Sequence, residues 1–241
     1  MKCLILAAGY ATRLYPLTEN FPKPLLEVAG KPILDHLIDD LEHCGGVDEY
    51  IVVTNHKFAP IFESWAASHR AVTIVDDGPS TNETRLGAVR DIQFAIEQCS
   101  IDDDLLVMAG DNLLDFSLGA FASYAQQKQA SCVMCYHEPD EVRLRRSGVA
   151  ELDADYRLLS LAEKPAEPKS HWCVPAFYCF TAQDVKLVGK AIEEGCSTDA
   201  PGSFIAWLCR QTEMFTWPMP GRRYDIGNLE SYNEVKQIFE K

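Results

Sequence analysis

The chain alternates two kinds of apolar pattern along its first half. Short continuous apolar runs, typical of buried strands, lie at 3–7, 50–54, 72–75 and 105–109. Longer stretches with an apolar residue at every third or fourth position, typical of amphipathic helices, lie at 32–44, 59–68, 86–98 and 118–127. Strands separated by helices of this length form βαβ units, so these four strands are predicted to run parallel in one sheet.

The pattern changes in the second half, where short strands follow each other with few residues between them. These strands are predicted at 132–136, 149–152, 158–162, 176–180 and 215–218. Helices are predicted at 184–194, 202–211 and 229–239. Closely spaced strands favour antiparallel pairing, so the expected fold class is α/β, a three-layer α/β/α sandwich around a Rossmann-like, mixed and mostly parallel sheet. A single domain over 1–241 is the default expectation.

Composition and charge exclude several classes of partner. With 47% hydrophobic and 24% charged residues, the chain has the composition of a soluble globular protein. Its 22 basic and 36 acidic residues give a net charge of −14, which opposes binding to nucleic acid or to an anionic membrane. No apolar run is long enough for a membrane helix, and nine cysteines are an odd count that suits a reducing compartment. A cytoplasmic protein is expected.

Candidate phosphate-binding residues follow the first predicted strand. Small residues in Ala7-Ala8-Gly9 allow backbone amides to approach an anion closely, and Arg13 adds a fork of charged donors. Lys23 stands between two prolines, a rigid mount for a charge that binds phosphate. The spacing matches neither the P-loop nor the dinucleotide-binding glycine pattern.

Two carboxylates far apart in the sequence are candidate metal ligands. Asp111 follows the strand at 105–109, and Asp225 precedes a helix start. Ligands of α/β sheets gather at the carboxyl ends of parallel strands, and a hard cation prefers oxygen donors. Taken alone, Asp111 is equally well interpreted as a turn or helix-cap residue.

These elements together resemble the sugar-1-phosphate nucleotidylyltransferase family. The family signature A-G-x-G-T-R-L, followed by P-K-x-L, is similar to Ala8-Gly9-Tyr10-Ala11-Thr12-Arg13-Leu14 and Pro22-Lys23-Pro24-Leu25. The family's G-D, E-K-P and late Y-D-I-G elements match residues 110–111, 163–165 and 224–227. The glucose-1-phosphate thymidylyltransferase and mannose-1-phosphate guanylyltransferase branches look closest. The fold implied is that of GT-A-like nucleotide-diphospho-sugar transferases.

The resemblance implies a role for each matched residue. Catalysis would involve Arg13, Lys23 and Asp111, with Mg²⁺ held by Asp111 and Asp225. The implied nucleotide-binding residues are Ala7, Ala8, Gly9, Thr12, Arg13, Lys23, Gly87 and Asp111, and the implied sugar-phosphate residues are Gly148, Glu163 and Lys164. Ala11 replaces the usual glycine, and Gly87 is only an approximate match to a base-recognition segment.

The implied reaction joins a nucleoside triphosphate (dTTP, UTP, CTP or GTP) to a sugar 1-phosphate with release of pyrophosphate. Residues 1–130 would form the nucleotide-binding half and 131–241 the sugar-phosphate-binding half. Two alternatives stay open: a cytidylyltransferase for a phosphorylated alcohol or phosphonate, and a catalytically silent nucleotide-sugar-binding module. A homo-oligomer is compatible with the sequence. The basic patch at Arg143, Arg145 and Arg146 is interpreted as a solvated loop, and Lys23 as an exposed residue of the pocket.

Overall fold

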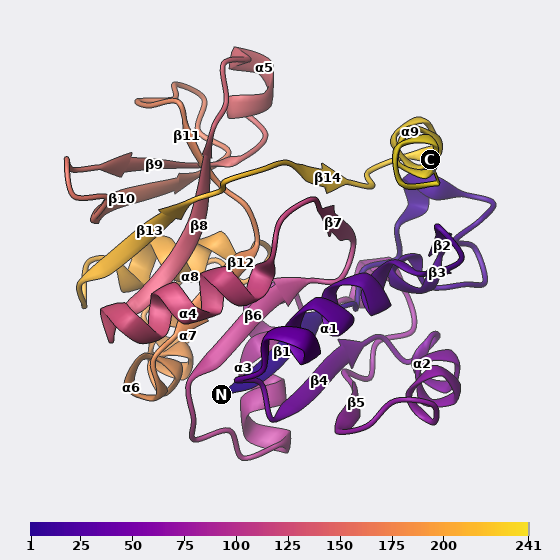
Figure 1. Cartoon of the computed structure of the whole chain (residues 1–241). Helices are drawn as coiled ribbons and strands as arrows, with labels where there is room; N and C mark the ends of the chain where they lie inside the picture. The colour runs from indigo at the N-terminus through magenta and orange to yellow at the C-terminus, as the bar shows by residue number, and fades with distance from the viewer. Residues whose placement is uncertain (241) are drawn as a thin grey trace.

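A parallel sheet forms the first half of the molecule. The computed structural model describes residues 1–240 and is shown in Figure 1. The first-half strands lie side by side in the order β5 (Val72–Asp76), β4 (Glu49–Thr54), β1 (Lys2–Leu6) and β6 (Leu105–Ala109). All three pairings are parallel, which confirms the prediction from the apolar runs.

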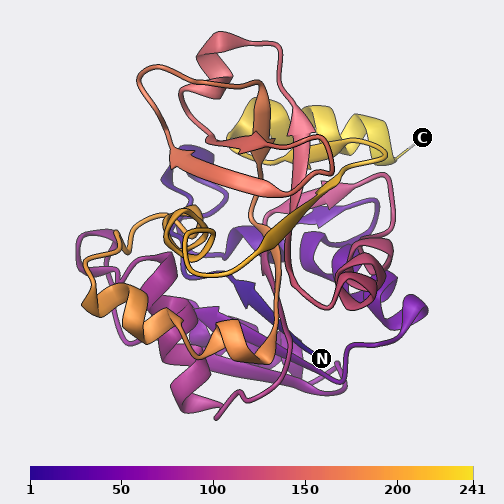
Figure 2. The same cartoon turned by 90° about the vertical axis from the view of Figure 1, so that its left-hand side faces the viewer.

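Alternate side chains of these strands point into two separate cores. On β1, Leu4 packs into a core shared with α3 (Ala88–Gln98), whereas Cys3 and Ile5 pack into a second core shared with α1 (Ile33–Cys44). This alternation follows from the two-residue period of a strand. Helices therefore cover both faces of the sheet, as Figure 2 shows, and the expected three-layer arrangement is confirmed.

The second half extends the same sheet with mainly antiparallel strands. Strand β12 (Phe177–Phe180) pairs antiparallel with β6, and the sheet continues through β8 (Ser131–His137), β11 (Trp172–Val174), β9 (Gly148–Leu152) and β10 (Leu158–Glu163). Strand β13 (Met214–Pro218) pairs parallel with β8. The sheet is mixed, as expected from the short spacing of these strands.

Helices of both halves complete the outer layers. Helix α2 (Ala59–Ala66) packs near β5, α4 (Leu118–Lys128) contacts α1, and α8 (Gly202–Leu208) contacts β10. Helix α9 (Leu229–Phe239) lies apart from the main sheet and contacts β2 (Glu27–Val28), which pairs antiparallel with β3 (Lys31–Pro32), and β14 (Arg223–Asp225). No helix within residues 1–240 has the length and apolarity needed to cross a membrane.

The prediction of one helix at 184–194 is wrong. The segment forms α6 (Ala182–Val185) and α7 (Val188–Glu193), because the amide of Leu187 donates to the carbonyl of Asp184 at 3.0 Å in a tight turn between them. The hydroxyl of Thr181 caps α6 by accepting from the amide of Asp184. Apolar periodicity alone does not reveal this break, because Val185 and Val188 both pack into the same core.

Several short elements carried no periodic signal and were not predicted. Besides β2, β3 and β11, they are β7 (Asn112–Leu114), β14 (Arg223–Asp225), α5 (Glu141–Leu144) and the 3₁₀ turns η1 (Thr12–Leu14), η2 (Lys23–Leu25) and η3 (Asn82–Thr84). Elements of two to four residues are too short to show a repeat. Of these, η1, η2 and β14 contain Arg13, Lys23 and Asp225, and β7 follows Asp111.

Candidate active site

The candidate residues lie near the point where successive connections of the parallel sheet lead to opposite sides of β1. The chain leaves β1 through α1 toward β4 on one side, whereas it leaves β5 through α3 and returns to β6 on the other side of β1. The carboxyl ends of β1 and β6 therefore flank the topological switch point, the usual ligand position in sheets of this type. The loop after β1 carries Gly9 to Arg13, and the turn after β6 carries Asp111.

The loop after β1 is held by hydrogen bonds from the neighbouring strand. The amide of Ala7 donates to the carbonyl of Val53 at 2.9 Å. The amide of the buried Asn55 side chain donates to the carbonyl of Ala8 at 3.0 Å. Gly9 is exposed, and a Cβ added there would meet no atom within 4 Å. The loop is thus fixed at its base and open at Gly9, as a phosphate-binding turn requires.

Ala11 occupies a backbone conformation that favours glycine. Its φ of 46° and ψ of 42° place it in the left-handed region. Its carbonyl accepts from the buried hydroxyl of Thr18 at 2.8 Å and from the amide of Leu14 at 2.9 Å. These bonds offset part of the strain that a Cβ suffers there, about 1 kcal/mol or more. The turn η1 therefore forms despite the substitution and leaves Arg13 exposed beyond it.

The antiparallel pair β7–β14 brings Asp225 next to the turn that carries Asp111. Asp225 on β14 pairs with Asn112 on β7, the residue after Asp111. The amide of Ile226 points to the carbonyl of Asp111 at 3.4 Å. Residues separated by more than a hundred positions are therefore neighbours at one edge of the sheet.

A continuous chain of polar contacts connects these residues. Lys23 Nζ donates to Asp111 Oδ2 at 2.7 Å, and Asn112 Nδ2 donates to Asp111 Oδ1 at 2.7 Å. Arg223 Nη1 then donates to Asn112 Oδ1 at 2.6 Å and lies 3.8 Å from Asp225 Oδ2. In this chain each cation contacts a carboxylate, and the amide of Asn112 connects the two ion pairs.

The interpretation of Lys23 as an exposed pocket residue is wrong. Only 7% of Lys23 is exposed, because the prolines on both sides are buried and turn η2 packs it beneath the loop. Gly110 contributes to this packing, since a Cβ there would lie 3.0 Å from Ile5 and 3.4 Å from Pro24. A buried ammonium group is costly without a partner, and Asp111 supplies it.

The donor set of this edge suits magnesium. Asp111, in the turn before β7, and Asp225, on the adjacent strand β14, offer hard carboxylate oxygens, and Mg²⁺ in nucleotide sites is usually bound by one or two carboxylates together with phosphates and water. Within residues 1–240, no group of three His, Cys, Asp or Glu side chains converges, which a protein-only site would need. The set fits an ion brought in with a triphosphate.

The predicted sugar-phosphate residues form a second group on β9 and β10. Gly148 and Glu163 are direct cross-strand partners. A Cβ on Gly148 would lie 3.2 Å from Glu163 Oε1, and one on Gly202 would lie 1.8 Å from the same atom. Burial raises the pKa of Glu163, and the charge of Lys164 opposes that rise. Two glycines therefore make the space in which this carboxylate lies.

Lys164 is positioned by the backbone next to Gly148. Its φ of 47° lies in the left-handed region, and its amide donates to the carbonyl of Ser147 at 3.0 Å. The side chain is exposed, and its charge helps to lower the pKa of Asp199, which is lowered mainly by a hydrogen bond from Arg85. Lys164 thus remains available to an anionic ligand beside Glu163.

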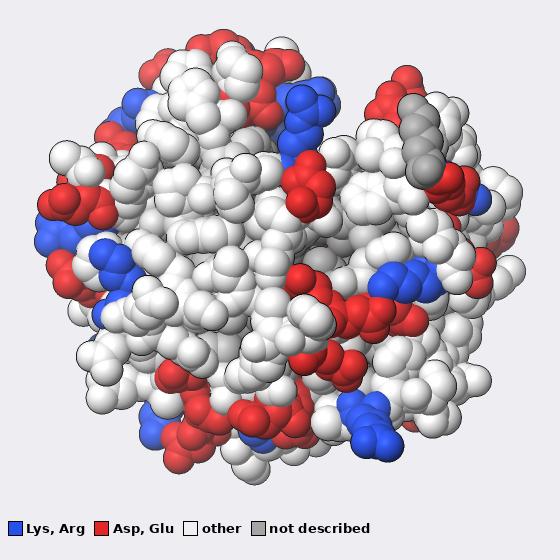
Figure 3. Space-filling model, in the orientation of Figure 1, with Lys and Arg blue, Asp and Glu red and all other residues white. Residues whose placement is uncertain are grey.

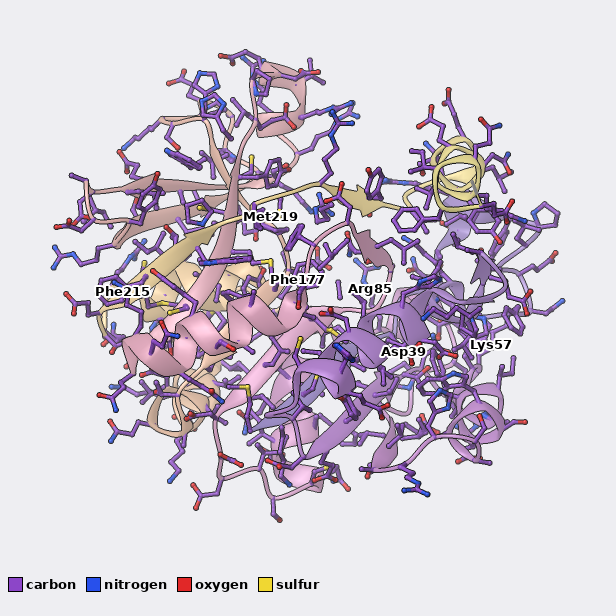
Figure 4. All side chains as sticks on the ribbon, in the orientation of Figure 1. Asp39, Lys57, Arg85, Phe177, Phe215 and Met219 are labelled. Atoms are coloured by element: carbon purple, nitrogen blue, oxygen red, sulfur yellow. The ribbon has the colours of Figure 1, made fainter. Side chains whose placement is uncertain are left out.

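Gly87 has a structural reason for being glycine. It precedes α3 with a φ of 94°, and a Cβ there would lie 2.5 Å from the carbonyl oxygen of Thr198. Arg85, labelled in Figure 4, also contacts the segment at 198–199, through a 2.8 Å ion pair with Asp199. The direct neighbours of Gly87 are therefore residues 198–199, and its predicted contact with the nucleotide stays a prediction.

Four residues of this region were not among the sequence-based candidates. Asn55 directly follows strand β4, which lies beside β1, and a polar residue at the end of a buried strand was the available signal. Asn112 and Arg223 adjoin the predicted aspartates in sequence. Gly202 has no sequence signal, because its closeness to Glu163 depends on where α8 packs against β10.

Comparison with known proteins agrees with the fold and the motifs. The family model described as nucleotidyl transferase matches residues 2–241. The chain is 32% identical to the UTP–glucose-1-phosphate uridylyltransferase AglF of Haloferax volcanii, over 98% of this chain and 96% of that protein. It is 25% identical to the glucose-1-phosphate adenylyltransferase of Fervidobacterium nodosum, over 96% of this chain and 59% of that longer protein.

Solved structures with the same fold include nucleotide-bound forms. A UTP-bound UGPase from Acinetobacter baumannii superposes with a TM-score of 0.79 at 20% identity, covering 99% of this chain and 92% of that one. A UDP-glucose pyrophosphorylase complexed with UDP-glucose gives 0.80, also at 20% identity, covering 99% and 97%. These likenesses show that the chain has the nucleotidyltransferase fold.

The family match and the shared sheet architecture assign the chain to the nucleotidyltransferase class of enzymes. The chain belongs to the nucleotidyl transferase family, whose relatives reported above are sugar-1-phosphate nucleotidyltransferases.

Proposed function

We propose that the protein transfers a nucleotidyl group from a nucleoside triphosphate to a sugar 1-phosphate, with UTP and glucose 1-phosphate as its first candidate substrates. The observation that carries this proposal is the polar chain from Lys23 through Asp111 to Arg223 and Asp225 at the switch point. The uridylyltransferase that aligns over nearly the full length of both chains favours this substrate pair over dTTP, CTP or GTP.

The reaction requires two polyanions to meet. An oxygen of the sugar phosphate forms a bond to the α-phosphorus, and the bond from that phosphorus to the bridging oxygen breaks, so that pyrophosphate leaves on the opposite side. No proton is transferred to or from the protein. Mg²⁺, which enzymes of this class generally use, would be held by Asp111 and Asp225 and would neutralise phosphate charge.

The chain's own residues perform positioning and charge neutralisation. The amides near Gly9 and the guanidinium of Arg13 would bind the triphosphate. The ammonium group of Lys23, which contacts Asp111, would neutralise negative charge on the α-phosphate. Lys164 would neutralise the sugar phosphate, while Glu163 accepts hydrogen bonds from sugar hydroxyls. Fixing both substrates in line supplies much of the rate enhancement in reactions of this kind.

A pyrophosphate-release assay tests the proposal. The protein is incubated with MgCl₂, each of UTP, dTTP, CTP, GTP and ATP, and a panel of sugar 1-phosphates and phosphorylated alcohols. Release that depends on a sugar 1-phosphate is the expected result, with UTP the fastest donor. Release with CTP and a phosphorylated alcohol alone would favour the cytidylyltransferase alternative. Binding of a nucleotide sugar without any release would favour the silent module.

A further inference from the structure

A wide cleft opens beside the paired strands β7 and β14. Its volume is about 1170 Å³. One wall comes from α5 and the loop after it, the other from α9, and β14 with the loop before it lies between them. Figure 3 shows the surface hollowed at this place, with basic side chains on the α5 wall, and Met219, which lines the cleft, is labelled in Figure 4. The volume is large enough for a ligand bigger than a single phosphate.

Arginines are concentrated in this cleft. Its lining includes Arg13, Arg143, Arg146, Arg222 and Arg223 against three acidic residues, Glu138, Asp225 and Glu234. This surplus of positive charge occurs in a chain whose net charge is −14. Like charges that share one cleft repel each other, so their gathering costs free energy unless an anion joins them.

Three of these arginines have no acidic partner within the part of the chain that the structure describes. Arg143 lies 3.9 Å from carboxylate oxygens of Glu138 and Asp140, and Arg223 is held by Asn112 and Asp225. Within residues 1–240, by contrast, no carboxylate lies within 4.0 Å of the guanidinium groups of Arg13, Arg146 or Arg222. Their donors are therefore free to bind a carboxylate or a phosphate in the bidentate geometry that guanidinium groups prefer.

The cleft belongs almost entirely to the half predicted to bind the acceptor. Arg13 is the only residue in its lining that precedes residue 131. Ser147 joins the cleft to the candidate sugar site, because its carbonyl accepts from the amide of Lys164 and it immediately precedes Gly148. A ligand in the cleft would therefore be continuous with the acceptor rather than with the nucleobase.

We propose that the acceptor is a sugar 1-phosphate with a second anionic group, and that Arg146 and Arg222 bind this group. The second anion is a carboxylate or a phosphate distant from the reacting phosphate. This inference rests on the proposed function, since it names the class of acceptor for the same site. An uncharged sugar would leave the two guanidinium groups without a partner, whereas a second anion satisfies them and fixes the sugar beside Glu163 and Lys164.

The test compares acceptors that differ only in their second charge. With UTP as donor, kcat/KM is measured for glucose 1-phosphate, glucuronic acid 1-phosphate and glucose 1,6-bisphosphate. The wild-type protein should prefer at least one charged acceptor about tenfold or more, and the preference should shrink as salt is added. The carboxylate and bisphosphate arms distinguish the two kinds of anion.

Variants locate the preference in the cleft. Arg146→Gln and Arg222→Gln should each reduce kcat/KM for the charged acceptor about tenfold, with little change for glucose 1-phosphate. Arg145→Gln is the matched control, because Arg145 is a neighbouring exposed arginine that pairs with Glu141 at 3.8 Å and does not line the cleft. Thermal unfolding of all three variants verifies that they are folded.

The outcomes separate this inference from the proposed function. If the wild-type protein has equal kcat/KM for charged and uncharged acceptors, the inference about the second anion is overturned. The proposed function stands in that case, because glucose 1-phosphate is still turned over. An equal loss in the Arg145→Gln control also overturns it, because the effect would then be one of general surface charge. Absence of turnover with every acceptor and donor overturns both proposals together.

Discussion

At the scale of single residues, the ion pair between Lys23 and Asp111 joins a buried lysine to a candidate metal ligand. Lys23 is buried and Asp111 is about one third exposed, so the lysine depends on this carboxylate for its charge balance. Asp225 is more than half exposed and has only a 3.8 Å contact with Arg223. The two candidate metal ligands should therefore respond differently to substitution.

We expect Asp225→Asn and Asp111→Asn each to reduce kcat at least about 100-fold, because each removes a ligand charge from the candidate metal site. Only Asp111→Asn should also reduce the free energy of unfolding, by about 1–3 kcal/mol, since it leaves the ammonium of Lys23 buried without a carboxylate. Initial-rate assays and denaturant unfolding measure the two effects.

The double variant Asp111→Asn/Lys23→Met is the matched control for stability. Replacing both partners should recover most of the lost free energy of unfolding without recovering kcat. If Asp111→Asn were as stable as Asp225→Asn, the argument that Lys23 depends on Asp111 would be wrong.

At the scale of elements, the contact between α8 and β10 sets the position of Glu163. Gly202→Ala places a methyl group where Glu163 Oε1 lies, 1.8 Å from the new Cβ. The carboxylate is the end of a flexible side chain, so it should move at small cost in stability. We expect KM for the sugar 1-phosphate to rise about tenfold with KM for the triphosphate unchanged. Steady-state kinetics with each substrate varied in turn measures this.

Gly189→Ala is the control for that experiment. Gly189 lies inside α7, and a Cβ there would have only a 3.4 Å contact with the side chain of Gln93. Its kinetic constants should match those of the wild-type protein. A similar rise in both KM values for Gly202→Ala would contradict a specific role for Glu163 in the sugar site.

The start of α3 depends on Gly87 in a different way. Gly87→Ala brings a Cβ to 2.5 Å from a backbone oxygen at a φ of 94°, and neither the backbone of Thr198 nor the turn can yield easily. We expect the free energy of unfolding to fall by about 1–3 kcal/mol, measured by denaturant titration. Wild-type stability would show that the segment at 198–199 moves freely.

At the scale of the whole molecule, a buried acid pair couples stability to pH. Asp77 follows β5 and Asp91 lies in the first turn of α3, and each is only 7% exposed. Burial, together with the charge of Asp76, raises the pKa of Asp77 to about 6. Burial, together with the charge of Asp77, raises the pKa of Asp91 to about 7. The Oδ1 atoms of Asp77 and Asp91 each lack a hydrogen-bond partner within residues 1–240.

Both pKa values lie above the ordinary value of 3.8, so the folded state binds more protons than the unfolded state between about pH 4 and pH 7. Stability from this pair is therefore complete below about pH 4 and is lost as the pH rises through 6 and 7. Asp91→Asn, which mimics the protonated acid, should raise Tm at pH 8 by at least about 2 °C relative to the wild-type protein. At pH 5 the difference should shrink, and scanning calorimetry at both values measures it.

The sequence by itself determined the class of fold and the family to which the chain belongs. Long apolar runs and helical repeats were sufficient for β1, β4, β5 and β6 and for the helices between them, because those elements bury whole faces. The family resemblance of its motifs was sufficient to nominate Arg13, Lys23, Asp111 and Asp225 as a candidate functional group. The resemblance to the family rests on these sequence motifs alone and needed no structure.

Only the tertiary structure decided which of these residues contact each other and which are buried. The ribbon β7–β14 is too short to show periodicity, yet its pairing places Asp225 beside Asn112. The burial of Lys23, the space that Gly202 leaves for Glu163 and the gathering of arginines between α5 and α9 all depend on contacts distant in sequence. Local patterns encode the elements, whereas contacts between remote segments form only when the elements pack.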